Sequence, residues 1–208
     1  MARTLERYPL FPLGLVLLPH ELVPLHIFEE RYKLMVGECL EGETGFGILW
    51  LSDDGLKDVG CCARITRVLE RFEDGRLNIL VEGTDPFVLR RRIEELPYPA
   101  GDVELLEDPE GAEPSPDTLE RARGRYADLV ERASDSRPDA EALEQLGAYA
   151  MAATLDVSPD AKQELLELRS EQARLERLEV LLADTMRRLA LAEEAAQRAA
   201  GNGSMRAR

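Results

Sequence analysis

The sequence is poor in the residues on which most catalytic and metal sites depend. Its 208 residues include two histidines, three cysteines and one tryptophan. A serine or cysteine nucleophile usually needs a histidine base, and a structural zinc site needs four ligands. His20 and His26 stand six residues apart, with no Cys-x-x-Cys or His-x-x-x-His beside them. The sequence therefore predicts no catalytic residue and no metal site.

Phosphate-binding loops and peptidase dyads are missing as well. Neither G-x-x-x-x-G-K-[ST] nor G-x-G-x-x-G occurs, and these are the loops that cradle nucleotide phosphates. The glycines of GETGFG, residues 42–47, are interpreted as a helix end followed by a strand start. No serine in a glycine-flanked turn lies near Lys33, Lys57 or Lys162. We therefore expect no cofactor and no enzymatic activity.

Positive charge is scarce throughout the chain. There are 26 basic and 41 acidic residues, which gives a formal net charge of −15. Nucleic-acid binding depends on Lys and Arg that displace phosphate counterions, so we expect no nucleic-acid partner. Arg90, Arg91 and Arg92 form the one basic cluster. It is interpreted as a charged strand end that discourages edge pairing, with contact to an anion or an acidic peptide as the alternative.

Long hydrophobic runs are absent. The apolar stretch at residues 10–18 is broken by Pro12 and Gly14, and it is too short to span a bilayer or to act as a secretory signal. We expect a cytoplasmic protein with reduced thiols and no membrane partner. The adjacent Cys61 and Cys62 fall on opposite faces of a predicted strand. One thiol is expected to point inward and the other outward, and a redox or metal role stays open as the alternative.

Prolines decide the structure of the first 30 residues. Pro9, Pro12, Pro19 and Pro24 rule out one long helix over residues 8–26, because proline inside a helix costs roughly 3 kcal/mol. The same residues are tolerated at strand ends and edges, which predicts extended segments at 9–12 and 22–27. A helix is predicted next, because two glutamates at 29–30 suit a helix start and apolar residues then recur at helical spacing until Gly42.

The middle of the chain is rich in short apolar and β-branched runs, whereas the last part is helical in pattern. The acidic, proline-containing stretch at 107–117 predicts a linker between domains at 1–110 and 118–200, with a disordered tail at 201–208. Leu168, Leu175, Leu182 and Leu189 recur every seven residues, and such a seam must bury against a helix of the same chain or of another. Strands are predicted at 45–51, 59–72, 76–83, 85–92 and 102–107 with a hairpin turn at 73–75, and helices at 118–133, 139–153 and 158–199.

Three blocks of sequence resemble one known family. PLFPLGLVLLPHELVPLHIFEERYKLMVGECL at residues 9–40 resembles the opening of the Lon N-terminal domain, the substrate-binding domain of the ATP-dependent protease Lon. The block at 59–89 resembles the family's G-x-x-A-x-I strand, D-G-R-x-N hairpin and V-x-G strand, and the block at 153–182 resembles its terminal helices. The resemblance covers nearly the whole chain in order.

The resemblance implies an α+β fold, in which a PUA-like β-pseudobarrel is followed by a helical bundle with one long helix. The ATPase and Ser/Lys peptidase modules that follow this domain in Lon have no counterpart in the 208 residues. The chain is therefore expected to be a stand-alone, non-catalytic protein that binds unfolded or hydrophobic polypeptide segments, with a Lon-type protease as a further partner. The alternatives are an oligomerising structural module and a PUA-like binder of RNA or small molecules.

The candidate binding residues come from the first loop and from the lone tryptophan. The loop between the two proline-flanked strands is expected to be partly exposed, and an exposed apolar patch is typical of a polypeptide-binding surface. The heptad seam of the last helix would support a homo-oligomer. The candidate polypeptide-binding residues are Leu15, Leu17, Leu18, Pro19, His20 and Trp50.

Overall fold

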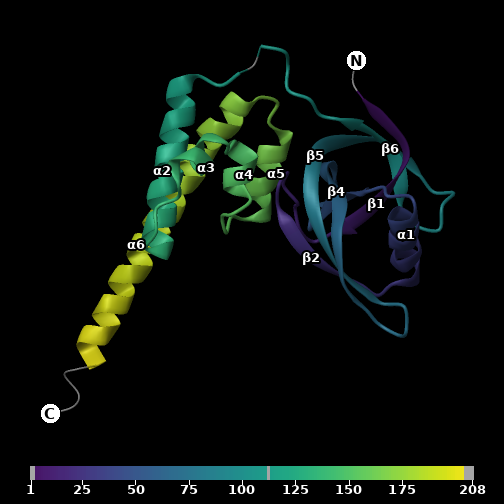
Figure 1. Cartoon of the computed structure of the whole chain (residues 1–208), viewed down its shortest axis with the longest axis horizontal. Coiled ribbons are helices and arrows are strands. Elements are labelled where there is room, and N and C mark those ends of the chain that lie inside the picture. The colour runs from purple at the N-terminus through teal and green to yellow at the C-terminus, as the bar shows by residue number, and fades with distance from the viewer. Residues whose placement is uncertain (1–2, 112, 204–208) are drawn as a thin grey trace.

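A computed structural model describes residues 3–111 and 113–203, and it has the predicted α+β architecture of a barrel followed by helices (Figure 1). Six strands and one helix form the first part, and five helices form the second. The strands are β1 Thr4–Leu13, β2 Leu22–Ile27, β3 Phe46–Ser52, β4 Gly55–Arg71, β5 Leu77–Ile93 and β6 Ala100–Leu105. The helices are α1 Glu30–Glu41, α2 Pro116–Ser134, α3 Ala140–Glu144, α4 Ala148–Ala152, α5 Pro159–Glu167 and α6 Glu171–Gly203.

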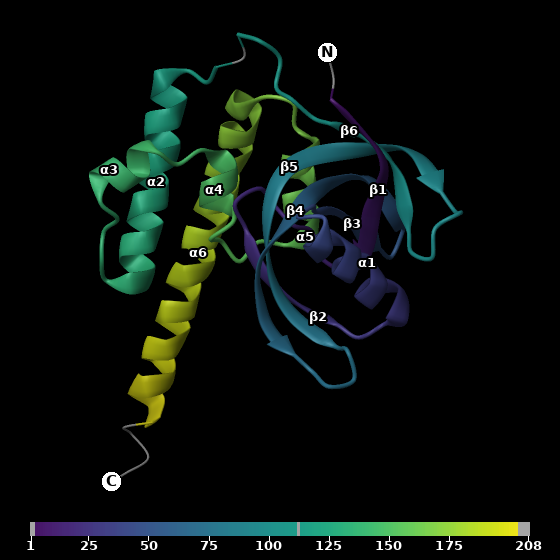
Figure 2. The ribbon, with the colours of Figure 1, turned by 45° about the vertical axis from the view of Figure 1, so that its right-hand side comes forward.

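The sheet closes on itself through β5, one of its two 17-residue strands. Its strand order is β2-β5-β4-β3-β1-β6, and β6 pairs back onto β5. β5 therefore pairs with β2 through residues 77–82 and with β6 through residues 87–93. Only the β1–β3 pair is parallel among the described pairs. Figure 2 shows β2 lying beside the beginning of β5, where it forms an edge of the sheet.

Proline placement explains the edge strand β2 and corrects the prediction for the fifth strand, β5. Pro24 lies in β2, which is an edge strand and tolerates a missing N–H donor. The predicted strands at 76–83 and 85–92 are instead one continuous strand, β5, with Pro86 in its interior. Pro86 faces Cys61 of β4, where the register shifts by a bulge. A bulge frees the local backbone from regular pairing, so the proline does not interrupt the strand.

Both faces of β4 are covered over residues 60–63, which corrects the prediction for the cysteine pair. Cys61 and Cys62 do point to opposite faces, but each is buried, in a different cluster of apolar side chains. Burial raises the pKa of the Cys61 thiol well above its usual range and raises that of Cys62 to about 11. Cys39 on α1 is buried too, and burial raises its pKa.

The three thiols are expected to resist modification in the native protein. DTNB reacts with the thiolate form of a cysteine. A pKa of about 11 by itself lowers the thiolate fraction of Cys62 at pH 8 by roughly a hundredfold relative to an ordinary thiol. We expect native protein to react at least that much more slowly than protein unfolded in guanidinium, in which all three thiols react. Rapid stoichiometric labelling of one thiol in the native state would contradict this expectation and would favour a redox role.

The second and third predicted helices are each broken in two. Residues 145–147 separate α3 from α4, and Gly147 is the N-cap of α4. Leu168 adopts an extended conformation after α5, and the Ser170 side chain accepts a hydrogen bond from the Ala173 N–H at the start of α6. α6 includes residues 201–203, which the sequence assigned to a disordered tail, whereas residues 204–208 lie outside the described residues.

The buried guanidinium of Arg174 holds these breaks in place. Its Nη1 donates to Asp108 Oδ1 at 2.9 Å and to the Leu168 carbonyl at 3.1 Å, and its Nε donates to Glu171 at 3.0 Å. The guanidinium carbon lies 4.6 Å from the centre of the Tyr149 ring. Burial disfavours the charge, but the contacts with Asp108, Tyr149 and Glu171 outweigh burial and raise the pKa of Arg174 above its usual range.

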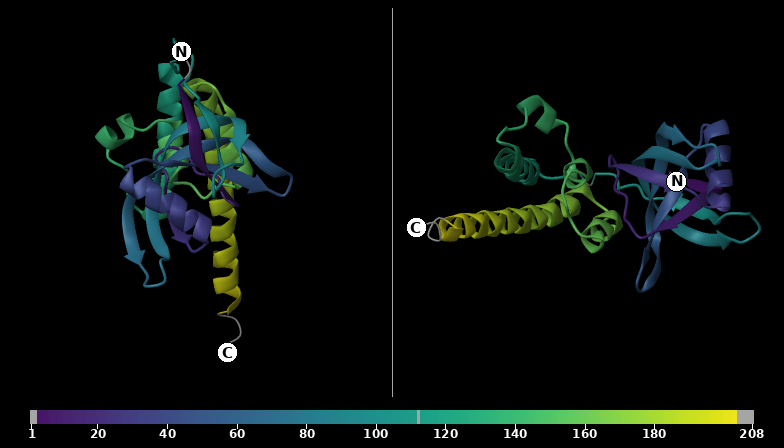
Figure 3. Two further views of the ribbon diagram at one scale, coloured as in Figure 1. Left: turned by 90° about the vertical axis from the view of Figure 1, so that its right-hand side faces the viewer. Right: turned by 90° about the horizontal axis from the view of Figure 1, so that it is seen from below.

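The leucine seam of α6 is buried within the chain. Leu175, Leu178 and Leu182 are inaccessible to solvent, and α2 packs along α6. Leu168 lies before α6, so the predicted seven-residue repeat begins at Leu175. The end of α6 projects away from the barrel (Figure 3).

α5 joins the helices to the barrel. It lies between the barrel and α6 (Figures 1 and 3). The Lys162 ammonium contacts the carboxylate of Glu21, and Gln163 Nε2 donates to the Val59 carbonyl of β4 at 3.1 Å. The side chains of Lys162 and Glu21 are largely shielded from solvent, and such pairs are screened less than surface pairs.

Candidate functional site

The loop proposed from the sequence is mostly core. Leu17 and Leu18 are 1% and 0% exposed, and Pro19 is buried as well. The structure therefore corrects the expectation that these three residues line an exposed patch. The loop crosses the sheet closely at Gly83, where a Cβ atom would lie 2.1 Å from the Leu18 carbonyl oxygen. Strand and loop thus pack backbone against backbone.

The other candidate residues reach the surface. Leu15 and Trp50 are partly buried, and His20 is exposed with a left-handed φ of 67°. The Lys57 ammonium lies 5.8 Å from the centre of the Trp50 ring. Leu13, which is near Leu15 in sequence, is the strand partner of Trp50. None of these residues lines the groove described next.

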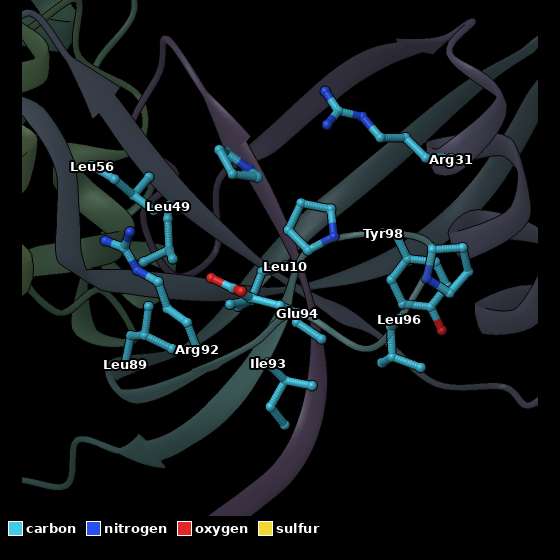
Figure 4. A pocket seen from close by; sticks show the side chains of 14 residues that line it. Leu10, Arg31, Leu49, Leu56, Leu89, Arg92, Ile93, Glu94, Leu96 and Tyr98 are labelled. Atoms are coloured by element: carbon cyan, nitrogen blue, oxygen red, sulfur yellow. The ribbon is translucent and has the colours of Figure 1, made fainter.

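An apolar groove of about 360 Å³ opens at the β5–β6 end of the barrel (Figure 4). β1, β3, β4, β5 and α1 all contribute side chains, together with the connection between β5 and β6. Small-molecule and side-chain sites are commonly concave, largely apolar and carry a few placed polar groups. The lining residues are Leu10, Pro12, Arg31, Leu49, Leu56, Leu89, Arg92, Ile93, Glu94, Leu96, Pro97, Tyr98, Pro99 and Ala100.

The buried Tyr98 anchors the β5–β6 connection beneath the groove. Its hydroxyl donates to the Glu38 carboxylate on α1. Burial, followed by this carboxylate, raises the pKa of Tyr98 to about 12, so the phenol stays neutral and keeps donating at physiological pH. The adjacent prolines Pro97 and Pro99 restrict the same connection. This wall of the groove is therefore held in one conformation before anything binds.

Three charged side chains lie at the rim of the groove. Arg31 and Arg92 lie on opposite sides in Figure 4, and Glu94 lies between them and nearer to Arg92. Arg31 is paired with Glu29 at 2.8 Å, and its guanidinium carbon lies 4.6 Å from the centre of the Tyr32 ring. The described residues contain no cluster of three or more His, Cys, Asp or Glu side chains placed to hold a metal ion.

The arginine cluster of β5 divides into paired and unpaired members. Arg90 donates to Glu104 at 2.8 Å and lowers the pKa of that carboxyl. Arg91 donates to Asp102 at 2.8 Å, and the backbone N–H of Arg7, followed by the Arg91 guanidinium, lowers the pKa of Asp102. Among residues 3–111 and 113–203, Arg92 has no such ion pair.

The groove is not apparent from the sequence, because its lining residues are dispersed along the chain. The lining residues run from position 10 to position 100, and no motif links them. One signal in the sequence is the cluster Arg90, Arg91 and Arg92, for which contact with an anion or an acidic peptide is the alternative interpretation. The proline-rich ELPYP stretch at 95–99 could have marked an ordered loop. Closure of β6 onto β5 is what gathers the other side chains.

The fold and the groove define a class of protein: a small closed β-barrel that carries a helical bundle and an open apolar groove. The sequence model of the ATP-dependent protease La (LON) substrate-binding domain matches residues 7–184. The chain belongs to this family, which confirms the resemblance found in its sequence. The matched description covers the substrate-binding domain alone.

Relatives of known sequence are Lon proteases. The chain is 26% identical over 208 residues to the Lon protease of Paraburkholderia phytofirmans, covering 93% of this chain and 26% of that protein. It is 28% identical over 185 residues to the Lon protease of Roseiflexus castenholzii, covering 82% of this chain and 23% of that protein. The chain thus spans about a quarter of the length of the curated relatives that it matches.

Solved structures of similar fold are N-terminal domains of Lon-type proteins. The Lon N-terminal domain protein from Xanthomonas campestris superposes with a TM-score of 0.65 at 26% identity, covering 86% of this chain and 98% of that one. The N-terminal domain of the Mycobacterium avium complex Lon protease gives a TM-score of 0.63 at 19% identity, covering 88% and 99%. These comparisons confirm the fold class. No described helix has the length and apolarity needed to cross a membrane.

Proposed function

We propose that this chain is a non-catalytic polypeptide-binding protein, and that its groove at the β5–β6 end of the barrel takes an apolar side chain of an unfolded or hydrophobic segment. The observation that carries the proposal is the pre-formed apolar groove in a chain that belongs to a substrate-binding family. A buried apolar side chain contributes roughly 1.5–3 kcal/mol, which is enough for weak, sequence-tolerant binding.

We propose that the two domains expected from the sequence have different roles. The barrel domain, residues 1–110, binds the polypeptide, and the helical domain, residues 118–200, supports the barrel. The buried contacts of α5 with Glu21 and Val59 favour this arrangement, because they tie the helices to the barrel. A Lon-type protease is the protein partner that we propose, on the ground that the full-length relatives carry this domain within a Lon protease.

Binding through the groove is tested with an aspartate at its wall. Leu56 and Leu96 line the groove and are partly accessible, so Leu56→Asp and Leu96→Asp place a charge where the apolar side chain would sit. We expect each change to weaken binding of a fluorescent, leucine-rich peptide by about tenfold or more, because the peptide would lose one well-packed apolar contact. Fluorescence anisotropy measures the binding.

The controls separate the groove from the loop surface. Leu69→Asp alters an exposed leucine of β4 outside the groove, and it should leave affinity unchanged. Trp50→Ala tests the surface of Leu15, His20 and Trp50, which remains a second candidate. Loss of binding on Trp50→Ala, together with normal binding by Leu56→Asp and Leu96→Asp, would move the site to that surface.

The oligomerising alternative has less support. Its sequence argument was the leucine seam, and Leu175, Leu178 and Leu182 of that seam are buried against the same chain. The RNA alternative is opposed by the net charge of −15. An electrophoretic shift at low salt tests it, and a salt-sensitive shift with single-stranded RNA would favour it over polypeptide binding.

A further inference from the structure

We propose that the segment bound in the groove carries an acidic side chain next to its apolar residue, and that Arg92 contacts that carboxylate. This inference rests on the proposed function, because it specifies which polypeptide segments the same groove prefers. It is carried by the position and the charge environment of Arg92.

Arg92 differs from its two neighbours for a structural reason. In the β5–β6 ladder, Arg91 pairs with Asp102, whereas Arg92 pairs with Gly101. A Cβ atom at Gly101 would lie 2.4 Å from Leu89 Cδ1 and 2.7 Å from the Arg91 carbonyl oxygen. Packing therefore requires glycine opposite Arg92, and no carboxylate can extend from that position.

The strand register thus leaves the Arg92 guanidinium without a carboxylate from β6, although the chain has 41 acidic residues. The neighbouring guanidiniums of Arg90 and Arg91 both hold carboxylates of β6. Arg92 is exposed and lines the apolar groove without an ion pair among the described residues. A guanidinium with free N–H groups is suited to a carboxylate, which it can bind through two parallel hydrogen bonds. The charge complementarity therefore favours an acidic group on the bound segment.

The other charges at the rim determine where that acidic group would lie. Arg31 is already paired with Glu29, so it offers a weaker attraction. Because Arg31 is occupied, an acidic side chain is directed to Arg92, while the apolar residue beside it occupies the floor formed by Leu10, Leu49 and Leu89. Glu94 lies nearer to Arg92 than to Arg31 (Figure 4), so its carboxylate reduces the attraction of Arg92 for that acidic group.

An acidic side chain within a segment fits the groove better than a free carboxyl terminus does. Terminal carboxylates are typically captured by clusters of backbone N–H groups. Pro12, Pro97 and Pro99 line this groove, and proline has no N–H to donate. The charge at the rim comes instead from side chains. The occupant that we infer is therefore an extended internal segment, such as one containing leucine followed by glutamate.

The test compares fluorescent peptides that differ in one group. Two peptides have uncharged ends and contain either Leu-Leu-Glu or Leu-Leu-Gln, and a third contains Leu-Leu-Gln and ends in a free carboxylate. We expect wild-type protein to bind the glutamate peptide about fivefold more tightly than the capped glutamine peptide, as for one solvent-accessible ion pair. The preference should shrink as salt is added.

Two rim variants should change that preference in opposite directions. Arg92→Gln should abolish the preference, so that the glutamate peptide and the capped glutamine peptide bind with equal affinity. Glu94→Gln should widen it, because a repelling carboxylate is removed. Arg67→Gln is the control for Arg92→Gln, because it removes one positive charge at an exposed arginine outside the groove. It should leave the preference as it is in the wild type.

Each outcome decides between defined alternatives. Equal binding of the two capped peptides by wild-type protein would overturn the inference and leave the proposed function standing. Tighter binding only of the free-carboxylate peptide would also overturn it, in favour of a terminal carboxylate. A preference that survives Arg92→Gln would assign the contact to another residue and overturn the role of Arg92. Failure of all three peptides to bind would overturn the proposed function itself.

Discussion

Replacing Arg174 with alanine is expected to lower the free energy of unfolding by about 1.5–3 kcal/mol, because it removes charge-assisted hydrogen bonds to the Leu168 carbonyl and to the partly exposed carboxylates of Asp108 and Glu171. Arg174 is 5% exposed and contacts Asp108, Glu171 and the Leu168 carbonyl. Glu171 in turn accepts a hydrogen bond from the Ala148 N–H at 2.6 Å, at the start of α4. One guanidinium thus connects the linker after the barrel with α4 and α6.

The expected effect is a considerable fraction of the stability of a typical domain. Natural domains are stable by about 5–15 kcal/mol, so the variant would lose a substantial part of its stability. Urea unfolding followed by circular dichroism measures the change, and the midpoint should fall sharply. Arg187→Ala is the matched control on α6, since the Arg187 side chain is 72% exposed and its pair with Asp184 is a surface pair.

The control is expected to change stability by no more than about 0.5 kcal/mol, the usual range for a surface substitution. If Arg174→Ala unfolds at the same urea concentration as Arg187→Ala, then Arg174 does not hold the helices as described. The breaks at 145–147 and 168–170 would then need another explanation.

Replacing Leu182 with glutamate is expected to unfold the helical part of the chain. Leu182 is 0% exposed. The change removes a buried leucine side chain, which costs about 2–5 kcal/mol, and it adds a charge that cannot be solvated there. We expect a large loss of helical circular dichroism signal at 25 °C, together with a lower midpoint in urea.

This substitution also distinguishes the two possible partners of the leucine seam. Leu191→Glu is the matched control, because Leu191 lies on the same helix and is 58% exposed; it should fold as the wild type does. Light scattering supplies the discriminating measurement. If wild-type protein is a dimer and Leu182→Glu is a well-folded monomer, the leucine seam joins two chains. That result would contradict the packing of the seam against helices of the same chain.

Much of the fold could be predicted from local patterns. The prolines at 9, 12, 19 and 24 excluded a helix, and β1 and β2 are the strands that result. The helix expected from the glutamates at 29–30 to Gly42 is α1. The hairpin expected at 73–75 connects β4 to β5. In each case the deciding interaction lies within a few residues, so the sequence contains the information locally.

The failures share one physical cause, which is contact between distant parts of the chain. The helix predicted over 158–199 breaks after α5 because the Leu168 carbonyl bonds to Arg174, which is held by Asp108. A serine at 170 followed by Glu171 is a usable helix-start signal, but continuous apolar spacing concealed it. Leu17 and Leu18 were expected at the surface because loops usually lie there, and the close approach at Gly83 buries them.

The candidate site divides in the same way. Three blocks of sequence were sufficient to indicate the family, because each block is a pattern of consecutive residues that does not depend on how the chain folds. The groove depends on β6 pairing with β5, which brings residues from position 10 to position 100 together and places a glycine opposite Arg92. Side-chain neighbours of that kind follow from the register between strands, and only the tertiary structure decides that register.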